Sequence, residues 1–138
     1  MNAGEISHSG QSKVHLVTGG AGMLGRAIAS QLLERGKSVR IIDIEPAKND
    51  RAEIIVGDIR DAAAVRRACE GVDTVFHTAA AVWDPKLPRS IYEETNITGT
   101  QIIIDNVGIL LPLVAGGAVY RHLYGSPDRR DETRLPVS

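Results

Sequence analysis

Three glycines at a spacing of three separate a short apolar run from a helical pattern near the start of the chain. Gly19, Gly22 and Gly25 follow the apolar residues 14–18 and lie at the start of the helical segment 22–35. The first glycine permits a tight turn out of a strand, the second a close approach of the backbone to a phosphate, and the third close packing of the helix on the sheet. Free N–H groups and the dipole at the helix start favour negative charge. The motif therefore predicts a strand–turn–helix unit that binds a pyrophosphate.

The alternation of strand-like and helix-like segments continues along the 138-residue chain. In the first helix the residues that recur at helical spacing are Met23, Leu24, Ala27, Ile28, Gln31 and Leu32. Further strands are expected at 38–44, 53–56, 72–78 and 113–120, and further helices at 61–70 and from residue 89 or 90 to 107. Asp61 is the expected N-cap of the 61–70 helix, and Gly36 and Gly71 stand where the first two helices should end. Strands that alternate with helices form right-handed crossovers. We expect an α/β fold, a doubly wound parallel sheet of the Rossmann type that is truncated after about five strands and has no substrate domain.

Composition divides the chain into three expected regions. Residues 1–12 are polar and are predicted to form a flexible tail, and residues 13–124 are predicted to form a partial dinucleotide-binding Rossmann domain. Residues 125–138 are polar and contain prolines, so an irregular C-terminal tail is expected there.

Charge and cysteine content exclude several classes of function. Sixteen Lys and Arg against 17 Asp and Glu give a net charge of −1, which offers no basic surface for nucleic acid or an anionic membrane. The single cysteine, Cys69, excludes a disulfide framework and a cysteine-based zinc site, and no metal site is predicted.

Residues 1–12 lack the apolar segment of a signal peptide. The apolar stretch 107–119 is too short for a membrane span, which needs about 20 residues. A cytoplasmic protein is expected.

An acidic residue stands at the end of the second predicted strand. Asp43 lies 18 residues beyond Gly25, where a carboxylate accepts hydrogen bonds from the adenosine ribose hydroxyls. The same charge repels a 2′-phosphate, and no arginine is expected to clamp such a group, so the pattern favours NAD over NADP. The alternative, a glycine-rich turn without a ligand, is disfavoured by this acidic partner. Arg40, in the same strand, is interpreted as a solvated charge at the strand edge.

Five motifs, in this order along the chain, resemble the extended short-chain dehydrogenase/reductase superfamily. That group includes nucleotide-sugar epimerases and dehydratases and the 3β-hydroxysteroid dehydrogenase-like enzymes. The resemblance covers about residues 13–105, and the His-Thr-Ala-Ala form is closer to the steroid-dehydrogenase branch. The matching segments are residues 18–25, Asp43, residues 57–59 (Gly-Asp-Ile), residues 77–80 (His-Thr-Ala-Ala) and residues 96–100 (Asn-Ile-Thr-Gly-Thr).

The resemblance implies roles for residues along the cofactor. Asp58 and Ile59 would flank the adenine, with the carboxylate taking the exocyclic amine. Ala79 and Ala80 would lie near the nicotinamide ribose, where only small side chains leave room, and Asn96 would hydrogen-bond backbone near the fourth strand. The residues expected to bind NAD are Gly19, Gly22, Met23, Leu24, Gly25, Asp43, Asp58, Ile59, Ala79 and Ala80.

Two side chains in these segments, and Trp83 beyond them, have other interpretations. Asp58 is as compatible with a turn-forming aspartate as with a ligand contact. His77 is interpreted as a core histidine whose hydrogen bonds are satisfied, and Trp83 either touches a substrate or covers the sheet edge.

The catalytic residues that the resemblance implies are absent from this chain. Alcohol oxidation or reduction in that superfamily uses a tyrosine as general acid/base and a lysine four residues later, which lowers the pKa of the phenol. No lysine follows a tyrosine at that spacing, and no hydroxyl side chain stands where a serine or threonine precedes the tyrosine segment. The lysines are Lys13, Lys37, Lys48 and Lys86, and the tyrosines are Tyr92, Tyr120 and Tyr124. No catalytic residue is predicted.

Three functions are compatible with this sequence. The first is a truncated or decayed relative of an NAD-dependent epimerase/dehydratase or hydroxysteroid dehydrogenase. The second is a stand-alone dinucleotide-binding module that senses NAD or acts with a partner chain. The third is an interaction protein that keeps the fold without a ligand, which the intact glycine loop and Asp43 disfavour.

A homo-oligomer, in the simplest case a dimer, is expected because an unpaired sheet edge recruits other chains. The resemblance places the helix with Ile102, Ile103 and Ile104 in the dimer contact.

Overall fold

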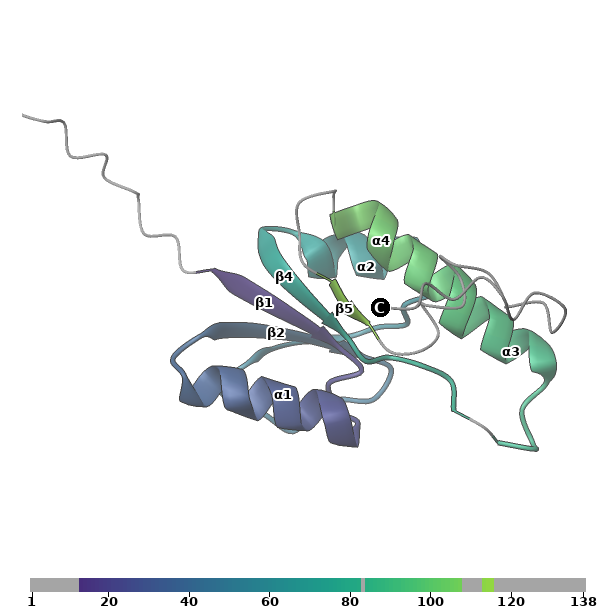
Figure 1. The fold of residues 1–138 in the computed structure, drawn as a ribbon, viewed down its shortest axis with the longest axis horizontal. Helices are drawn as coiled ribbons and strands as arrows, with labels where there is room; N and C mark the ends of the chain where they lie inside the picture. The colour runs from purple at the N-terminus through teal and green to yellow at the C-terminus, as the bar shows by residue number, and fades with distance from the viewer. Residues whose placement is uncertain (1–12, 83, 108–112, 116–138) are drawn as a thin grey trace, which may run out of the picture.

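A parallel sheet of five strands forms the centre of the protein (Figure 1). The computed structural model describes residues 13–82, 84–107 and 113–115. In these residues the strands lie in the order β3-β2-β1-β4-β5, which confirms the predicted doubly wound α/β class. The elements are β1 (Val14–Thr18), α1 (Met23–Glu34), β2 (Ser38–Asp43), β3 (Glu53–Val56), α2 (Ala62–Cys69), β4 (Val72–His77), α3 (Arg89–Glu93), a π-helical segment (Glu94–Gly99), α4 (Thr100–Val107) and β5 (Leu113–Ala115).

Helices cover both faces of the sheet, with α1 on one side and α2 and α4 on the other (Figure 1). Successive strand residues point to opposite faces, so Leu16 and Ile42 pack with α2 and α4, whereas Val17 and Ile41 pack with α1. All four side chains are at most 1% exposed. Burial on both faces explains why these strands have continuous apolar runs instead of alternating polar residues.

Most predicted element boundaries agree with the structure to within one residue. Asp61 is the N-cap of α2, since its carboxylate accepts hydrogen bonds from the backbone N–H groups of Ala63 and Ala64. Gly36 and Gly71 have φ values of 71° and 65° after the ends of α1 and α2, as predicted. The interpretations of residues 1–12, Trp83, the strand beyond residue 115 and residues 125–138 lie outside the described residues.

The predicted apolar face of α1 is wrong at Met23, Leu24, Ala27 and Gln31, all of which are exposed. Met23 and Leu24 are 89% and 61% exposed, while the buried residues of the helix are Gly25, Ala29, Leu32 and Leu33. The helix begins immediately after the glycine loop, so its first turn lies at the carboxyl edge of the sheet and not above it. The two apolar side chains are therefore available at that edge.

Arg40 is not the solvated edge charge that the sequence suggests. Its side chain is only 14% exposed, and its Nε donates to Glu53 at 2.7 Å. Its guanidinium also donates to the carbonyl oxygens of Ala68 at 2.9 Å and Glu70 at 2.6 Å. Because β3 pairs with β2 and places Glu53 opposite Arg40, this position is inside the sheet. The arginine satisfies carbonyl groups at the C-terminal end of α2, where a cation is favourable.

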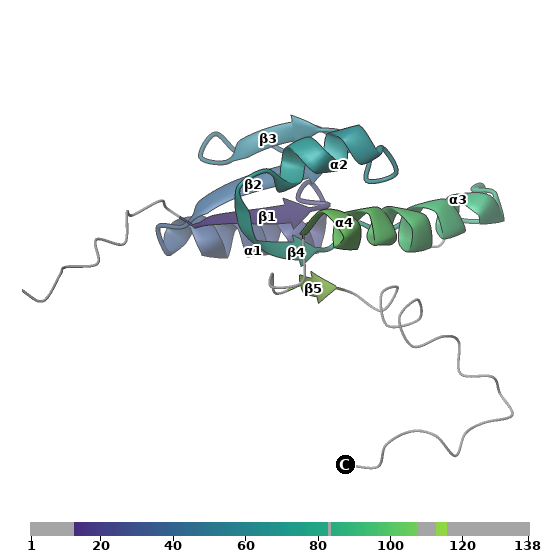
Figure 2. The same ribbon diagram turned by 90° about the horizontal axis from the view of Figure 1, so that it is seen from above.

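The helix predicted from residue 89 or 90 to 107 is continuous but contains a π-helical turn. Figure 2 shows α3, the π-helical segment and α4 as one long helix that extends beyond the ends of the central strands. Gly99, the last residue of the π-helical segment, packs so closely that an added Cβ would lie 2.8 Å from Ile59. Single π turns occur often at functional sites.

Candidate functional site

The predicted site residues converge at one edge because the carboxyl ends of the parallel strands meet there. Backbone hydrogen bonds tie four strand ends together: Gly19 N–H donates to Ile42 at 2.8 Å, Gly57 N–H to Asp43 at 2.9 Å, and Thr78 N–H to Thr18 at 3.2 Å. β1 lies between β2 and β4, so the connections on its two sides run in opposite directions. Ligands of open α/β sheets bind at such a switch point.

The glycine loop is shaped by close backbone contacts. Gly19 has a φ of 69°, and an added Cβ would lie 2.7 Å from the Cα of Ala79, in the segment after β4. An added Cβ on Gly25 would lie 2.3 Å from the carbonyl oxygen of Gly19. Gly25 therefore allows the helix to pack on the loop itself, whereas the sequence suggested packing on the sheet. At the exposed Gly22, an added Cβ would meet only the Gly19 oxygen, at 3.3 Å.

Gly20 is a further required glycine that the sequence pattern does not single out. An added Cβ there would lie 2.4 Å from Cγ2 of Ile41, a buried side chain of β2. This contact is with a residue of the neighbouring strand, so the spacing of the glycines in the sequence cannot reveal it.

Asp43 is held between the glycine loop and the turn that follows β2. Its Oδ2 accepts a hydrogen bond from the Ala21 N–H at 2.9 Å, and its Oδ1 accepts one from the Glu45 N–H at 3.0 Å. Each carboxylate oxygen has a second lone pair, so the carboxylate is oriented and can still accept from a ligand hydroxyl. Ala21 is thus a positioning residue that the motif alone does not reveal.

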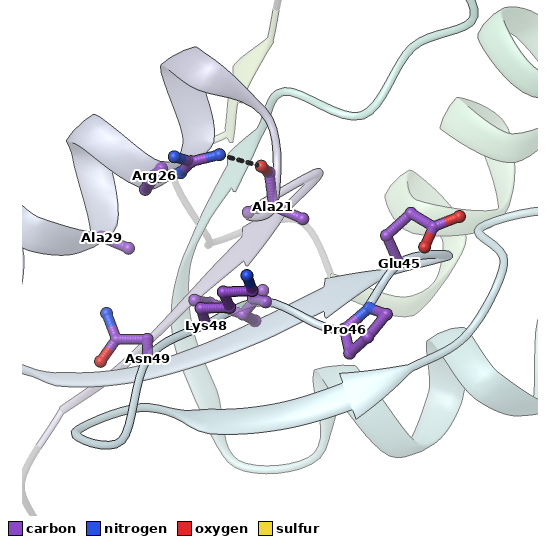
Figure 3. A pocket seen from close by; sticks show the side chains of 10 residues that line it. Ala21, Arg26, Ala29, Glu45, Pro46, Lys48 and Asn49 are labelled. Carbon is purple, nitrogen blue, oxygen red and sulfur yellow. Dashed lines mark hydrogen bonds between the residues drawn. The ribbon is translucent and has the colours of Figure 1, made fainter.

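A pocket of about 310 Å³ adjoins Asp43, between α1 and the turn after β2 (Figure 3). It is lined by Gly20, Ala21, Arg26, Ala29, Ile41, Glu45, Pro46, Ala47, Lys48 and Asn49. Arg26 donates to the Ala21 carbonyl at 3.0 Å, and Lys48 lies on another wall. Ala21 and Glu45, whose N–H groups bind Asp43, also line this pocket. Arg26 is therefore a cationic residue of this region that the sequence analysis did not single out.

Asp58 is paired with Arg60, and Ile59 is buried. The Arg60 N–H donates to Asp58 Oδ1 at 2.8 Å, and the Arg60 guanidinium donates to Oδ2 at 2.7 Å. These hydrogen bonds to Arg60 lower the pKa of Asp58. Ile59 is 4% exposed and packs in the core with Gly99. An adenine contact from Ile59 would have to come from its backbone, since its side chain is directed into the core.

Asn96 holds the segment after β4, as predicted. Its Oδ1 accepts from the Ala81 N–H at 2.7 Å and its Nδ2 donates to the Ala81 carbonyl at 3.0 Å. Within the same segment, Ala79 is half-buried against Gly19 and Ala80 is exposed. The π-helical segment therefore positions the two alanines through their neighbour Ala81.

His77 is a core histidine with both ring nitrogens bonded, as predicted. It is 3% exposed, with Nδ1 2.6 Å from the Thr18 hydroxyl and Nε2 2.9 Å from the Thr100 hydroxyl. The Thr18 hydroxyl already accepts from the N–H groups of Thr78 and Ala79, so its own proton goes to Nδ1. We assign the proton of the neutral ring to Nε2. Burial lowers the pKa of His77 to about 4.

Five exposed apolar side chains stand at the same edge of the sheet. Three of them were not predicted as site residues: Ile44 after β2, Val56 at the end of β3 and Val82 after β4, which are 65%, 59% and 76% exposed. Met23 and Leu24, which were predicted, complete the group. Apolar surface beside oriented polar groups is typical of a small-molecule site.

Other chemistry finds little support in the described part of the chain. Tyr92, the tyrosine that is described, has its hydroxyl bonded to the backbone N–H and carbonyl of Asp84. Among residues 13–82, 84–107 and 113–115, no three His, Cys, Asp or Glu side chains are grouped to hold a metal ion. None of the helices in these ranges has the length and apolar character needed to cross a membrane.

The chain is similar to known proteins of the short-chain dehydrogenase type. Residues 16–109 match the model of the 3-beta hydroxysteroid dehydrogenase/isomerase family. The uncharacterized protein y4nG of Sinorhizobium fredii is 41% identical over 95 residues, which are 67% of this chain and 24% of that protein. A 3 beta-hydroxysteroid dehydrogenase/Delta 5→4-isomerase of Mycobacterium tuberculosis is 44% identical over 70 residues, 49% of this chain and 19% of that protein.

A solved structure gives the same picture for the fold. A short-chain dehydrogenase/reductase superfamily protein of Agrobacterium tumefaciens, crystallised with bound NAD, is 35% identical with a TM-score of 0.63. The match covers 68% of this chain and 28% of that one. The chain thus spans less than a third of the length of each of these three proteins.

Proposed function

Because this chain belongs to the 3-beta hydroxysteroid dehydrogenase/isomerase family, we propose that it is an NAD-binding domain of an extended short-chain dehydrogenase. The observation that carries the proposal is the bonded unit of glycine loop and acidic residue: Asp43 accepts from Ala21 of the loop, and Gly19 N–H is tied to the end of β2. The NAD bound to the related Agrobacterium protein supports the choice of cofactor.

The proposed contacts would hold NAD from the adenine to the nicotinamide ribose. The open side of Gly22 leaves room for the pyrophosphate, because a Cβ there would meet only the loop oxygen. Asp43 would accept from the adenosine ribose hydroxyls, Asp58 from the adenine amine, and the small Ala79 and Ala80 would leave space near the nicotinamide ribose. When bound, NAD supplies the group that accepts a hydride.

We expect NAD to bind about tenfold more tightly than NADP, because a 2′-phosphate beside Asp43 costs about 1.4 kcal/mol of Coulomb repulsion. Asp43→Ala should remove most of this preference, since Arg26 and Lys48 remain in the adjoining pocket. Titration calorimetry with both cofactors measures the ratio of affinities. In the Asp43→Ala background, Arg26→Gln should weaken NADP selectively. Equal affinities in the unmutated protein would contradict the role of Asp43.

The chain on its own should oxidise no alcohol, steroid or nucleotide sugar. A general acid/base contributes about 10²–10⁴-fold to the rate, and the sequence contains no Tyr-x-x-x-Lys pair to supply it. Spectrophotometric assays of NADH formation with such substrates should therefore stay at background while NAD binds. Sustained NADH formation that follows the purified protein through successive columns would contradict this expectation.

The intact binding loop without that pair favours a second candidate, a dinucleotide-binding module that senses NAD or acts with a partner chain. A partner that carries a Tyr-x-x-x-Lys pair would restore turnover on mixing. The dimer expected from the sequence stays a prediction, and it cannot use Ile103, which is fully buried in the contact of α4 with the sheet and α2.

A further inference from the structure

We propose that Arg60, held between Asp58 and Glu94, is a positioning residue that makes the site selective for the exocyclic amine of adenine. The proposal rests on the proposed function, because it concerns how Asp58 would meet the base of NAD. Neither the glycine loop nor Asp43 has a part in it, so the two can be tested separately.

Three donor groups of Arg60 bind the Asp58 carboxylate, which has about four acceptor sites and so keeps one for a ligand. The Arg60 N–H donates to Oδ1 at 2.8 Å, Nε lies 3.1 Å from Oδ1 and 3.0 Å from Oδ2, and Nη2 donates to Oδ2 at 2.7 Å. Such multiple contacts fix both the plane and the rotamer of a carboxylate. Asp58 is therefore held in one orientation at the end of β3 before any ligand arrives.

Glu94 holds the other side of the same guanidinium. Arg60 Nη1 donates to Glu94 Oε2 at 3.1 Å, and Glu94 is the first residue of the π-helical segment. The turn after β3 meets this segment at a second point, where Ile59 packs on Gly99. These two contacts with the same helical segment fix the position of the Arg60 guanidinium. Arg60 in turn fixes the orientation of the Asp58 carboxylate.

The chemistry of the Asp58 carboxylate determines which ligand groups it can bind. An ionised carboxylate can only accept hydrogen bonds. An aspartate is ionised at neutral pH, and the hydrogen bonds from Arg60 lower the pKa of Asp58 further. The carboxylate therefore attracts the amine of adenine and repels the carbonyl that hypoxanthine carries at the same position. The side chains of Arg60, Asp58 and Glu94 are 37%, 31% and 53% exposed. Ion pairs this exposed contribute little to stability, so their loss should change recognition more than folding.

The test compares the binding of NAD with that of nicotinamide hypoxanthine dinucleotide by calorimetry. The unmutated protein should prefer NAD by about tenfold, the value of one hydrogen bond to a charged group. Arg60→Gln should reduce this ratio to about twofold, and Glu94→Gln should give an intermediate ratio. Arg60→Lys, which keeps the charge but not the fork of donors, should restore only part of it.

Two controls separate positioning from general damage. Asp58→Ala should abolish the preference for NAD, since it removes the acceptor. Arg89→Gln breaks a more exposed ion pair with Glu93, at 3.3 Å on the same long helix, and should leave the ratio unchanged. The ratio is insensitive to a loss of folded protein, because both ligands are measured on the same sample.

The outcomes distinguish this proposal from the proposed function. If NAD binds but Arg60→Gln and Glu94→Gln keep the ratio of the unmutated protein, the positioning role is wrong and the NAD site stands. An unchanged ratio in Asp58→Ala would overturn the proposal in the same way. If the unmutated protein binds neither dinucleotide, the NAD site itself is wrong, and the role of Arg60 fails with it.

Discussion

Gly25→Ala should destabilise the protein by about 3 kcal/mol, the upper range for inserting a methyl group where there is no room. The new Cβ would lie 2.3 Å from the Gly19 carbonyl oxygen and 2.8 Å from the Gly20 Cα. Both neighbours are backbone atoms, so no side chain can rotate away, and α1 would have to move from the loop. Denaturant unfolding followed by circular dichroism measures the change in the free energy of unfolding.

Two other glycines give matched controls for this substitution. Gly36→Ala meets no atom within 4 Å, although its φ of 71° is unfavourable for alanine, and should cost about 1 kcal/mol. Gly22→Ala has a φ of −75° and should change stability by less than about 1 kcal/mol. Its methyl group would, however, occupy the space that we propose for the pyrophosphate. If Gly25→Ala is as stable as Gly36→Ala, the close packing of α1 on the loop is wrong.

Stability should fall by about 3 kcal/mol as the pH drops from 6.5 to 4, because His77 is buried in its neutral form. Its pKa is about 4 in the folded protein, against 6.5 for an ordinary histidine. In this window the unfolded chain binds a proton that the folded protein does not, so stability rises with pH and is complete above 6.5. The lowered pKa of Asp58 acts at lower pH, where its carboxylate takes up a proton.

His77→Asn should flatten this pH profile, measured by denaturant unfolding at steps between pH 4 and 8. His15 is the matched control: its pKa is also lowered, chiefly by burial, but its side chain is more accessible than that of His77. His15→Gln should therefore leave most of the profile in place. A profile that is unchanged in His77→Asn would show that other groups cause the loss.

The sequence was sufficient to predict the fold and the hydrogen-bonding roles of two polar residues near the site, Asn96 and His77. The glycine spacing, the Asp61 cap and the αL glycines are encoded within a few residues, and the structure agrees with each. Asn96 and His77 have the bonding that was expected of them. The cap and the αL glycines depend on local backbone geometry, which a single sequence displays directly. The Asn96 contact was implied by the family resemblance, and the partners of Asn96 and His77 lie 15 to 59 residues away along the chain.

The features that the sequence did not reveal depend on contacts between distant segments. Arg40 became a helix cap because α2 ends beside β2, and Gly20 is required because Ile41 stands opposite it. The Ile59 side chain is buried because the π-helical turn places Gly99 against it. Arg26 reaches the pocket near Asp43 only once α1 is folded over the turn after β2. None of these partners is close in sequence.

Titration calorimetry of the protein with NAD tests the central claim most directly, with Gly22→Ala as the paired variant. The predicted result is saturable binding of one NAD per chain, weakened about tenfold or more in Gly22→Ala, a loss of at least about 1.4 kcal/mol, while thermal unfolding of the two proteins stays similar. The absence of saturable binding to the folded, unmutated protein would contradict the assignment of the glycine loop and Asp43 as an NAD site.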